Sequence, residues 1–488
     1  MCGTARVIMP QSHSHSRITT AMLNDLINVV NNILWGQWQV LIVLLVLVGL
    51  WFTIRLGAVQ IRHFGHMFAL IRGSTQDDSS GISSFQALCT SLSARVGTGN
   101  LAGVAMAISV GGPGAVFWMW IIALLGMATG FAESLLAQVY KVRDSHREFR
   151  GGPAYYIQMG LGSRWLAVLF SVCLFLGYGL FFSAMQANTI TDALNNAYAI
   201  ETQYSGLIIT VVAGMIVIGG LRKIARFAEL VVPVMGVLYV ITALAITVIN
   251  YQLVPDMLLQ IVQSAFGLQE AGAGALGAAI KAGIQRGLYS NEAGSGSAPH
   301  AAAGASPKPN HPATQGYIQM LGVFFDTLVL CTCTALIILL AGTNSTGEMT
   351  GIRLTQDAMT HHIGGYGLHF VSVAISLFAF TSVVANYAYA QSNLRIFNLD
   401  TKAGNIGYTI AYLSMVLWGS NASLKEVWGA ADMALGLMTV VNVTALILLT
   451  PTIAAVSKDY FRQREAGQSP SFSTEKCPVQ GKVEPGIW

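Results

Sequence analysis

Two glycine-rich segments interrupt long apolar stretches, and they carry the groups best suited to binding chemistry. The first is SARVGTGN (residues 93–100), and the second is GLYSNEAGSGS (residues 287–297). Glycine costs a helix about 1 kcal/mol relative to alanine, so each segment predicts a break in a helical run. The half-helix after a break presents free N–H groups and a positive dipole end, which suit a carboxylate. The half-helix before it ends in free carbonyl oxygens, which suit Na⁺ or an ammonium group.

Each interrupted segment also contains a charged side chain, Arg95 in the first and Glu292 in the second. A charge at membrane depth costs at least about 2.5 kcal/mol, a cost that a plain membrane anchor avoids. The competing interpretation is helix packing, because Gly99 and Gly103 form a GxxxG pattern that lets two helices approach closely. The two segments taken together favour a binding role, and we expect Arg95 and Glu292 to pair across the two breaks.

The composition requires a membrane protein. Of the 488 residues, 53% are hydrophobic and only 10% are charged, whereas a soluble domain has about 25% charged residues. The 26 Lys and Arg residues are too dispersed for a nucleic-acid surface, so no nucleic-acid partner is expected. The six cysteines are scattered and form no zinc motif. The sequence indicates the lipid bilayer and a small molecule as partners, and no obligate protein partner is evident.

Eleven stretches are long and apolar enough to predict membrane-spanning helices, since a span needs about 20 mostly apolar residues. A polar N-terminus with an amphipathic helix at the membrane interface (1–35) precedes them, and a cytoplasmic tail (451–488) follows. The predicted spans are roughly 36–54, 84–110, 113–138, 165–190, 204–221, 227–250, 274–300, 315–341, 366–392, 404–420 and 426–450.

The loop charges give an orientation for these spans. Lys and Arg concentrate in the odd-numbered connections and in the tail, with few on the opposite side. Under the positive-inside rule, the N-terminus faces outward and the C-terminus faces the cytoplasm.

The two breaks lie five spans apart, and five is odd. The chain is therefore expected to contain an extra first helix (36–56) and two five-helix repeats of inverted topology (83–250 and 272–450). Interrupted spans at matching positions of two repeats are the best sequence indication of a central transport site.

Other polar residues within the spans are weaker candidates. Adjacent hydroxyls at Thr381 and Ser382 could supply oxygen ligands to a cation, although hydrogen bonds to their own helix are the commoner role. Asp326 is a carboxylate deep in a span, where such groups usually face the bundle interior. Glu133 and Asp432 are expected nearer to span ends. Gln186 could line the site or join helices.

Four motifs resemble those of the alanine or glycine:cation symporter family, also called the sodium:alanine symporters, and the likeness covers about residues 22–465. The resemblance implies an all-α polytopic protein of the bacterial inner membrane with the LeuT-like fold, which imports alanine or glycine with sodium. The motifs are GTGNLAGVAMAISVGGPGAVFWMW (97–120), GMATGFAESLLAQVYK (126–141), FRGGPAYYI (149–157) and YSNEAGSGSAPHAAA (289–303).

The resemblance also assigns residues. The unwound stretch Gly97, Thr98, Gly99 and Asn100 would hold the substrate carboxylate by its amides. Na⁺, the one expected cofactor, would be bound by the carbonyl oxygens of Ser93, Val96 and Phe378 and the hydroxyls of Thr381 and Ser382. Arg95 and Glu292 depart from the pattern of this fold, so a second sodium site could be absent or replaced.

The sequence therefore predicts a sodium-coupled importer of alanine or glycine that works by alternating access, and not an enzyme. Groups around the second break would receive the substrate ammonium, and Gln186 would line the pocket; the candidates are Leu288, Ser290, Asn291 and Glu292. The alternative is a proton-coupled permease of the same fold, with Glu292 or Asp326 relaying the proton. An intramembrane enzyme is disfavoured because no nucleophile or metal set is present, and a passive channel would not accumulate its substrate.

Overall fold

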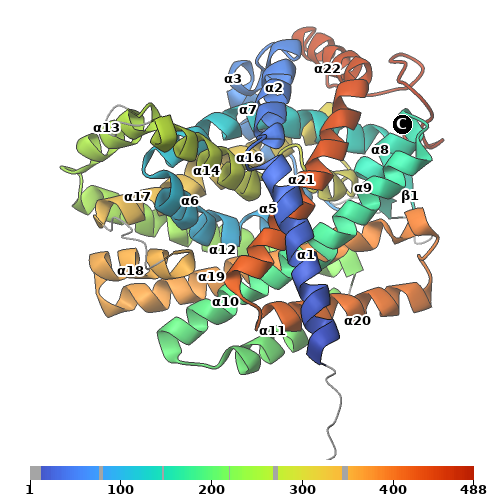
Figure 1. Ribbon diagram of the computed structural model, residues 1–488. Coiled ribbons are helices and arrows are strands. Elements are labelled where there is room, and N and C mark those ends of the chain that lie inside the picture. The colour runs from blue at the N-terminus through green and yellow to red at the C-terminus, as the bar shows by residue number, and fades with distance from the viewer. Residues whose placement is uncertain (1–12, 76–80, 145–147, 219, 268–272, 343–349) are drawn as a thin grey trace, which may run out of the picture.

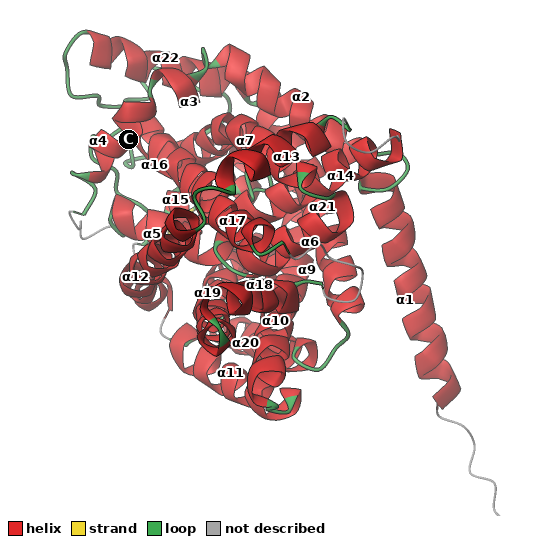
Figure 2. Cartoon of the chain, turned by 90° about the vertical axis from the view of Figure 1, so that its left-hand side faces the viewer, coloured by secondary structure: helices red, strands yellow, loops and turns green. Residues whose placement is uncertain are grey.

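The computed structural model describes residues 13–75, 81–144, 148–218, 220–267, 273–342 and 350–488. In these residues nearly all regular structure is helical (Figure 2). One short antiparallel hairpin is present, formed by β1 (Val142–Arg143) and β2 (Phe149–Arg150). The predicted all-α class is thus confirmed.

Six helical segments are long and apolar enough to cross a bilayer, judged by length and composition over the described residues. Two of these segments each consist of two α-helices joined by a π-helical stretch. They are α7 (Gly114–Val139), α9–η2–α10 (Arg164–Leu176, Gly177–Phe181, Phe182–Tyr198), α12 (Gly220–Ile249), α16–η3–α17 (Pro312–Val323, Phe324–Cys331, Thr332–Leu340), α19 (Gly365–Ser392) and α21 (Leu424–Leu448).

The other predicted spans coincide with shorter or broken helices. They are α2 (Val40–Arg55), α5 with η1 and α6 (Ser84–Arg95, Gly99–Gly103, Val104–Gly111), α11 (Thr202–Val217), α14 with α15 (Ala273–Asn291, Ala298–Ala303) and α20 (Lys402–Gly419). Each of the eleven predicted ranges therefore contains a helix or a broken pair. Their number as membrane crossings and the two inverted repeats stay predictions.

Both predicted interruptions are present. After α5 ends, Val96 adopts an extended conformation (ψ 94°) and turns the chain before η1 begins. After α14 ends, Glu292 has a φ of +55° and Gly294 and Gly296 have φ near +90°. A non-glycine residue in the left-handed region carries strain that the surrounding structure must compensate. The non-helical conformation of residues 292–297 is therefore maintained by the surrounding structure.

The remaining helices precede, connect or follow these segments. They are α1 (His13–Leu34), α3 (Val59–Arg62), α4 (Phe64–Ile71), α8 (Pro153–Gly160), α13 (Val254–Ala265), α18 (Ile352–Ile363), η4 (Leu394–Phe397) and α22 (Thr450–Glu465). Helix α1 begins at His13, within the range 1–35 in which the sequence predicted a polar N-terminus and an interfacial helix; residues 1–12 lie outside the described residues. Helix α18 lies in the connection between the predicted spans 315–341 and 366–392.

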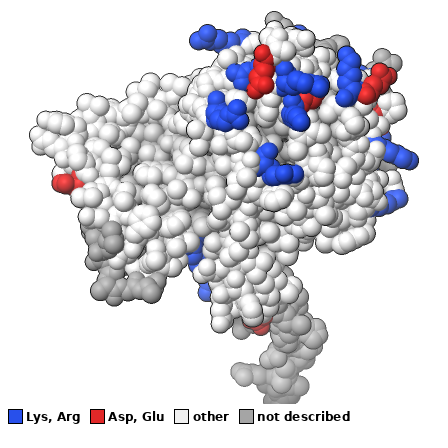
Figure 3. All heavy atoms as spheres, turned by 90° about the horizontal axis from the view of Figure 1, so that it is seen from above, with Lys and Arg blue, Asp and Glu red and all other residues white. Residues whose placement is uncertain are grey.

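On the face shown in Figure 3, basic side chains gather on one side. In Figure 3 most of the visible Lys and Arg side chains lie in the right-hand half, the side on which Figure 1 places β1 and the C-terminus. The left-hand half, where α13 lies in Figure 1, is almost free of them. This distribution agrees with the loop charges, and the orientation of the termini stays a prediction.

Candidate functional site

The two broken helices meet beside their interruptions, where the start of η1 contacts the last turn of α14. A Cβ atom on Gly99 would lie 3.2 Å from the carbonyl oxygen of Tyr289 and 3.3 Å from the Cα of Ser290. The side-chain amide of Asn100 donates to the Ser290 hydroxyl at 3.2 Å. Glycine at position 99 therefore permits the backbone-to-backbone approach that brings the free groups of both breaks together.

Five oxygen atoms converge between α5 and α19. The Ser382 hydroxyl lies 2.8 Å from the Ser93 carbonyl oxygen, 3.4 Å from that of Val96 and 3.2 Å from that of Phe378. The Thr381 hydroxyl lies 2.8 Å from the Phe378 oxygen and 3.4 Å from the Ser93 oxygen. All five residues are buried. Carbonyl oxygens at an unwound helix end, completed by hydroxyls, fit a small alkali cation in both charge and hardness.

The donors of the first break are directed at a side-chain oxygen. The N–H and the hydroxyl of Thr98 both donate to Oε1 of Gln186, at 2.9 and 2.7 Å. The N–H of Gly97 donates to Oδ1 of Asn100 at 3.1 Å. The sequence predicted that these amides would be available to a carboxylate; in the structure an amide oxygen from α10 accepts the two Thr98 bonds.

Gly97 lies between these two groups of atoms. A Cβ on this residue would stand 2.5 Å from the Ser382 hydroxyl and 2.7 Å from Oε1 of Gln186. The cluster of five oxygens and the Gln186 oxygen that is bonded to Thr98 are therefore separated only by Gly97, which has no side chain. An ion in the first would lie close enough to a carboxylate in the second for direct attraction.

Of the candidates in the second break, Ser290 belongs to this cluster. Its hydroxyl donates to Oδ2 of Asp326, whose Oδ1 accepts from the Asn100 amide at 2.9 Å. The Thr327 hydroxyl donates to the same carboxylate at 2.9 Å. Asp326 is fully buried and joins both broken helices to η3, in agreement with its predicted position in the bundle interior.

Leu288, Asn291 and Glu292 are engaged within their own segment instead. The Leu288 carbonyl accepts from the Glu292 N–H at 2.8 Å, and Oδ1 of Asn291 accepts from the Ala293 N–H at 3.0 Å. The Glu292 carboxylate accepts from the Ser297 hydroxyl at 2.5 Å. These bonds close the turn after α14, whereas the buried Nδ2 of Asn291 has no hydrogen-bond partner among the described residues.

The expected pairing of Arg95 with Glu292 is wrong as a direct contact. Arg95 is 1% exposed, and among the described residues none of its three guanidinium nitrogens has a hydrogen-bond partner. It acts at longer range, since its charge interacts electrostatically with the carboxyl groups of Glu133, Glu292 and Asp326. Arg95 thus compensates several buried acids without bonding to one.

An ion pair that the sequence did not predict lies beside the second break. Arg286 of α14 contacts both carboxylate oxygens of Asp432 of α21, at 3.1 and 3.2 Å, and its guanidinium lies 4.4 Å from the ring centroid of Trp428. The Tyr289 ring packs against Trp428 at 5.1 Å and against Phe182 at 5.0 Å. The signal in the sequence was a charged residue within one turn of an aromatic residue on each helix, but the pairing itself has no local signature.

Comparison with known proteins agrees with this architecture. The profile of the sodium:alanine symporter family matches residues 20–474. The amino-acid carrier protein AlsT of Bacillus subtilis is 45% identical over 458 residues, with 94% of this chain and 96% of AlsT covered. The probable sodium/glutamine symporter GlnT of the same organism is 44% identical, with 95% and 96% covered.

A solved structure shares the fold. MhsT in complex with L-phenylalanine superposes with a TM-score of 0.58 at 12% sequence identity, covering 78% of this chain and 93% of MhsT. At this identity the similarity concerns the fold alone, and it supports the predicted LeuT-like class. The family match spans nearly the whole chain, and its members are transporters and not enzymes. The chain belongs to the sodium:alanine symporter family.

Proposed function

We propose that this protein is a secondary active symporter that imports alanine or glycine together with sodium across the bacterial inner membrane. The observation that carries the proposal is the cluster of five buried oxygens between α5 and α19, one residue away from the donors of Thr98. Na⁺ is held there by Ser93, Val96, Phe378, Thr381 and Ser382. Its charge then favours the substrate carboxylate, which has to leave water to enter the pocket.

The substrate carboxylate binds at the first break. The N–H and hydroxyl of Thr98 supply two donors that point at one acceptor position, now held by Gln186. Neighbouring Gly99 and Asn100 lie against Ser290 of the second break. A zwitterion with a small side chain fits between the two, because its carboxylate faces the Thr98 donors while its ammonium faces the oxygens of Ser290 and Asp326.

Transport follows when the two broken helices move between outward and inward arrangements. Sodium bridges α5 to α19 and so favours the arrangement in which the groups of both breaks surround the substrate site. The Arg286–Asp432 pair and the aromatic rings beside it lie next to the same break, on α14 and α21. When this ion pair opens, the substrate can reach the site from one side of the membrane. When it closes, the bound substrate can no longer return to that side.

The test is uptake of labelled alanine into proteoliposomes that contain the purified protein. An inward sodium gradient is expected to drive accumulation above the external concentration, and dissipating that gradient with an ionophore is expected to abolish it. A potassium gradient of equal size serves as the control. Equal uptake with and without a sodium gradient would refute sodium symport.

Two alternatives have specific support. The buried carboxylate of Asp326 beside Asn100 could carry a proton, which would make a pH gradient alone sufficient for uptake. The similarity to GlnT raises glutamine as a substrate. Competition by unlabelled glycine and glutamine against labelled alanine separates the substrate candidates. Uptake driven by an inward pH gradient in the absence of sodium tests the proton route.

A further inference from the structure

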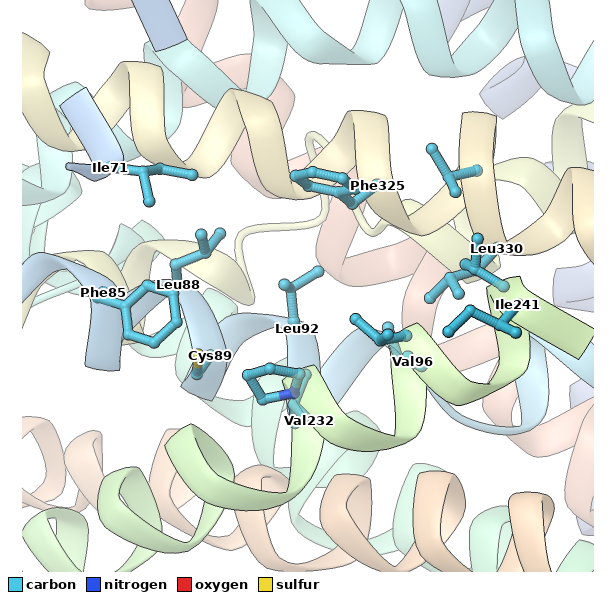
Figure 4. Close-up of a pocket in the computed structure, with 15 residues that line it drawn as sticks. Ile71, Phe85, Leu88, Cys89, Leu92, Val96, Val232, Ile241, Phe325 and Leu330 are labelled. Atoms are coloured by element: carbon cyan, nitrogen blue, oxygen red, sulfur yellow. The ribbon is translucent and has the colours of Figure 1, made fainter. Parts of the chain in front are cut away.

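A groove lined by apolar side chains runs between α5, α12 and η3 (Figure 4). Its volume is about 410 Å³. On α5 it is lined by Phe85, Leu88 and Leu92, which recur every three or four positions and therefore form one stripe of the helix. Val96 continues this lining directly after the helix ends. No charged or hydrogen-bonding side chain other than a cysteine thiol lines it, so neither an amino acid nor an ion is a suitable ligand.

The opposite wall of the groove belongs to a helix at the edge of the bundle. Only 28% of the most apolar stretch of α12 is buried, and the side chains of Leu230, Val237 and Ile241 are more than half exposed. Gly236 lines the groove, and an added Cβ there would have no atom within 4 Å. An exposed apolar surface of this extent is compatible with lipid and not with water.

The dimensions of the groove match one acyl chain. On α12 the lining runs from Val232 to Ile241, a rise of about 14 Å at 1.5 Å per residue. The hydrocarbon core of a bilayer is about 30 Å thick, so one leaflet accounts for half of that. An unfilled void would leave its walls without dispersion contacts, and a single chain from one leaflet would supply them along the whole groove.

Basic side chains lie at one end of the groove. Ile71 and Phe85 mark this end in Figure 4, and exposed Arg72 directly follows Ile71. Arg226 is also exposed and precedes the groove-lining part of α12 by less than two turns. The acidic Glu229 lies on the same helix but accepts a bond from Gln86 at 3.0 Å. This arrangement favours an anionic headgroup over a neutral one.

We propose that this groove is a binding site for one acyl chain of an anionic phospholipid, whose phosphate lies at Arg72 and Arg226. The site is connected to transport by α5. Val96 lines the groove with its side chain and directs its carbonyl oxygen toward Ser382. A chain in the groove therefore packs against the back of the proposed sodium site and holds α5 in position.

Photolabelling tests the binding. The protein is reconstituted with a phosphatidylglycerol that carries a diazirine on its acyl chain, irradiated, and digested for mass spectrometry. We expect label in peptides that cover 85–96 and 232–241. Gly236→Leu fills the groove and should reduce this label to the level seen with an excess of unlabelled lipid. Gly407→Leu is the matched control, because Gly407 is an exposed helical glycine of α20 with no atom within 4 Å of an added Cβ.

Label in the groove that Gly236→Leu leaves unchanged would overturn the proposal. The headgroup is tested by the same probe as phosphatidylcholine. Wild type should label more strongly with phosphatidylglycerol, and the double variant Arg72→Gln with Arg226→Gln should label equally with both. Equal labelling of wild type by the two probes would also overturn the proposal.

A functional measurement depends in addition on the proposed sodium symport. In liposomes without anionic lipid, the half-saturating sodium concentration of wild type should rise at least about fivefold, as for a typical coupling between two sites. That of Gly236→Leu should not rise, because leucine replaces the chain. If wild type shows no sodium-driven uptake in any lipid, symport is refuted while the labelling result stands. If the labelling fails, only the lipid site is refuted.

Discussion

The substitution Ser382→Ala removes one of the five oxygens proposed to bind sodium. In the structure this hydroxyl is the group that reaches all three carbonyls of the cluster, at 2.8 to 3.4 Å. A hydrogen-bond-type contact to a charged group contributes about 1.5–3 kcal/mol, and 1.4 kcal/mol corresponds to a factor of ten. The half-saturating sodium concentration is therefore expected to rise about 10- to 100-fold.

The assay is a sodium titration of alanine uptake into proteoliposomes at saturating alanine. Ser376→Ala is the matched control, since the Ser376 hydroxyl on the same helix donates only to the Ser372 carbonyl at 2.7 Å; its sodium dependence should equal that of wild type. Thr381→Ser keeps the second hydroxyl and should also stay near wild type. A Ser382→Ala variant that loses maximal rate at an unchanged sodium requirement would refute the assignment of this cluster.

Three further substitutions test the surrounding structure. Gly97→Ala places a methyl group 2.5 Å from the Ser382 hydroxyl, so the half-saturating concentrations of both sodium and alanine should rise in uptake titrations; a rise in only one would contradict the shared position of this glycine. Asp432→Asn leaves Arg286, whose side chain is 11% exposed, without its counter-ion, which should destabilise the protein by about 3 kcal/mol and lower its melting temperature; an unchanged melting temperature would contradict a structural ion pair. Burial lowers the pKa of His311 from 6.5 to about 4, so the unfolded chain binds the proton more readily than the folded protein. The contribution of neutral His311 to folding stability is therefore complete above pH 6.5 and lost toward pH 4. Thermal melts of His311→Gln should show a weaker pH dependence than wild type over this range.

The parts of the site that the sequence predicted are those with local causes. Glycine clusters and buried charges within apolar stretches locate the helix breaks, because the free-energy cost of glycine in a helix and of a charge in a membrane depends on the residue type alone. A break also predicts free carbonyl oxygens, since the last turn of any helix leaves such oxygens without partners, but their assignment to Ser93 and Val96 comes from the family resemblance. Thr381 and Ser382 could be placed opposite them only through the family resemblance, because adjacent hydroxyls alone do not distinguish a ligand from a helix-bonded side chain.

The parts that the sequence missed depend on contacts between distant segments. Arg286 and Asp432 lie 146 positions apart, and each alone looks like an isolated charge within a span. The direction of a side chain is equally non-local. Asn291 and Glu292 occupy a break that faces the site, but their side chains bond to Ala293 and Ser297, because the turn leaves backbone and hydroxyl donors that need acceptors. A helix break therefore predicts which backbone groups are free more reliably than which side chains face the ligand.

The position of Gln186 has a consequence for how substrate enters. Its Oε1 accepts two bonds from Thr98, as one oxygen of a carboxylate would, so the donors of the first break are satisfied inside a buried site. A carboxylate forms charge-assisted bonds about twice as strong as those of a neutral acceptor, and can therefore displace the amide oxygen without leaving Thr98 unpaired. We infer that sodium at the neighbouring oxygens favours this exchange, because its charge attracts the anionic carboxylate far more than the neutral amide. Coupling between ion and substrate then arises from the choice of acceptor at Thr98 and requires no direct bond between Gln186 and the ion.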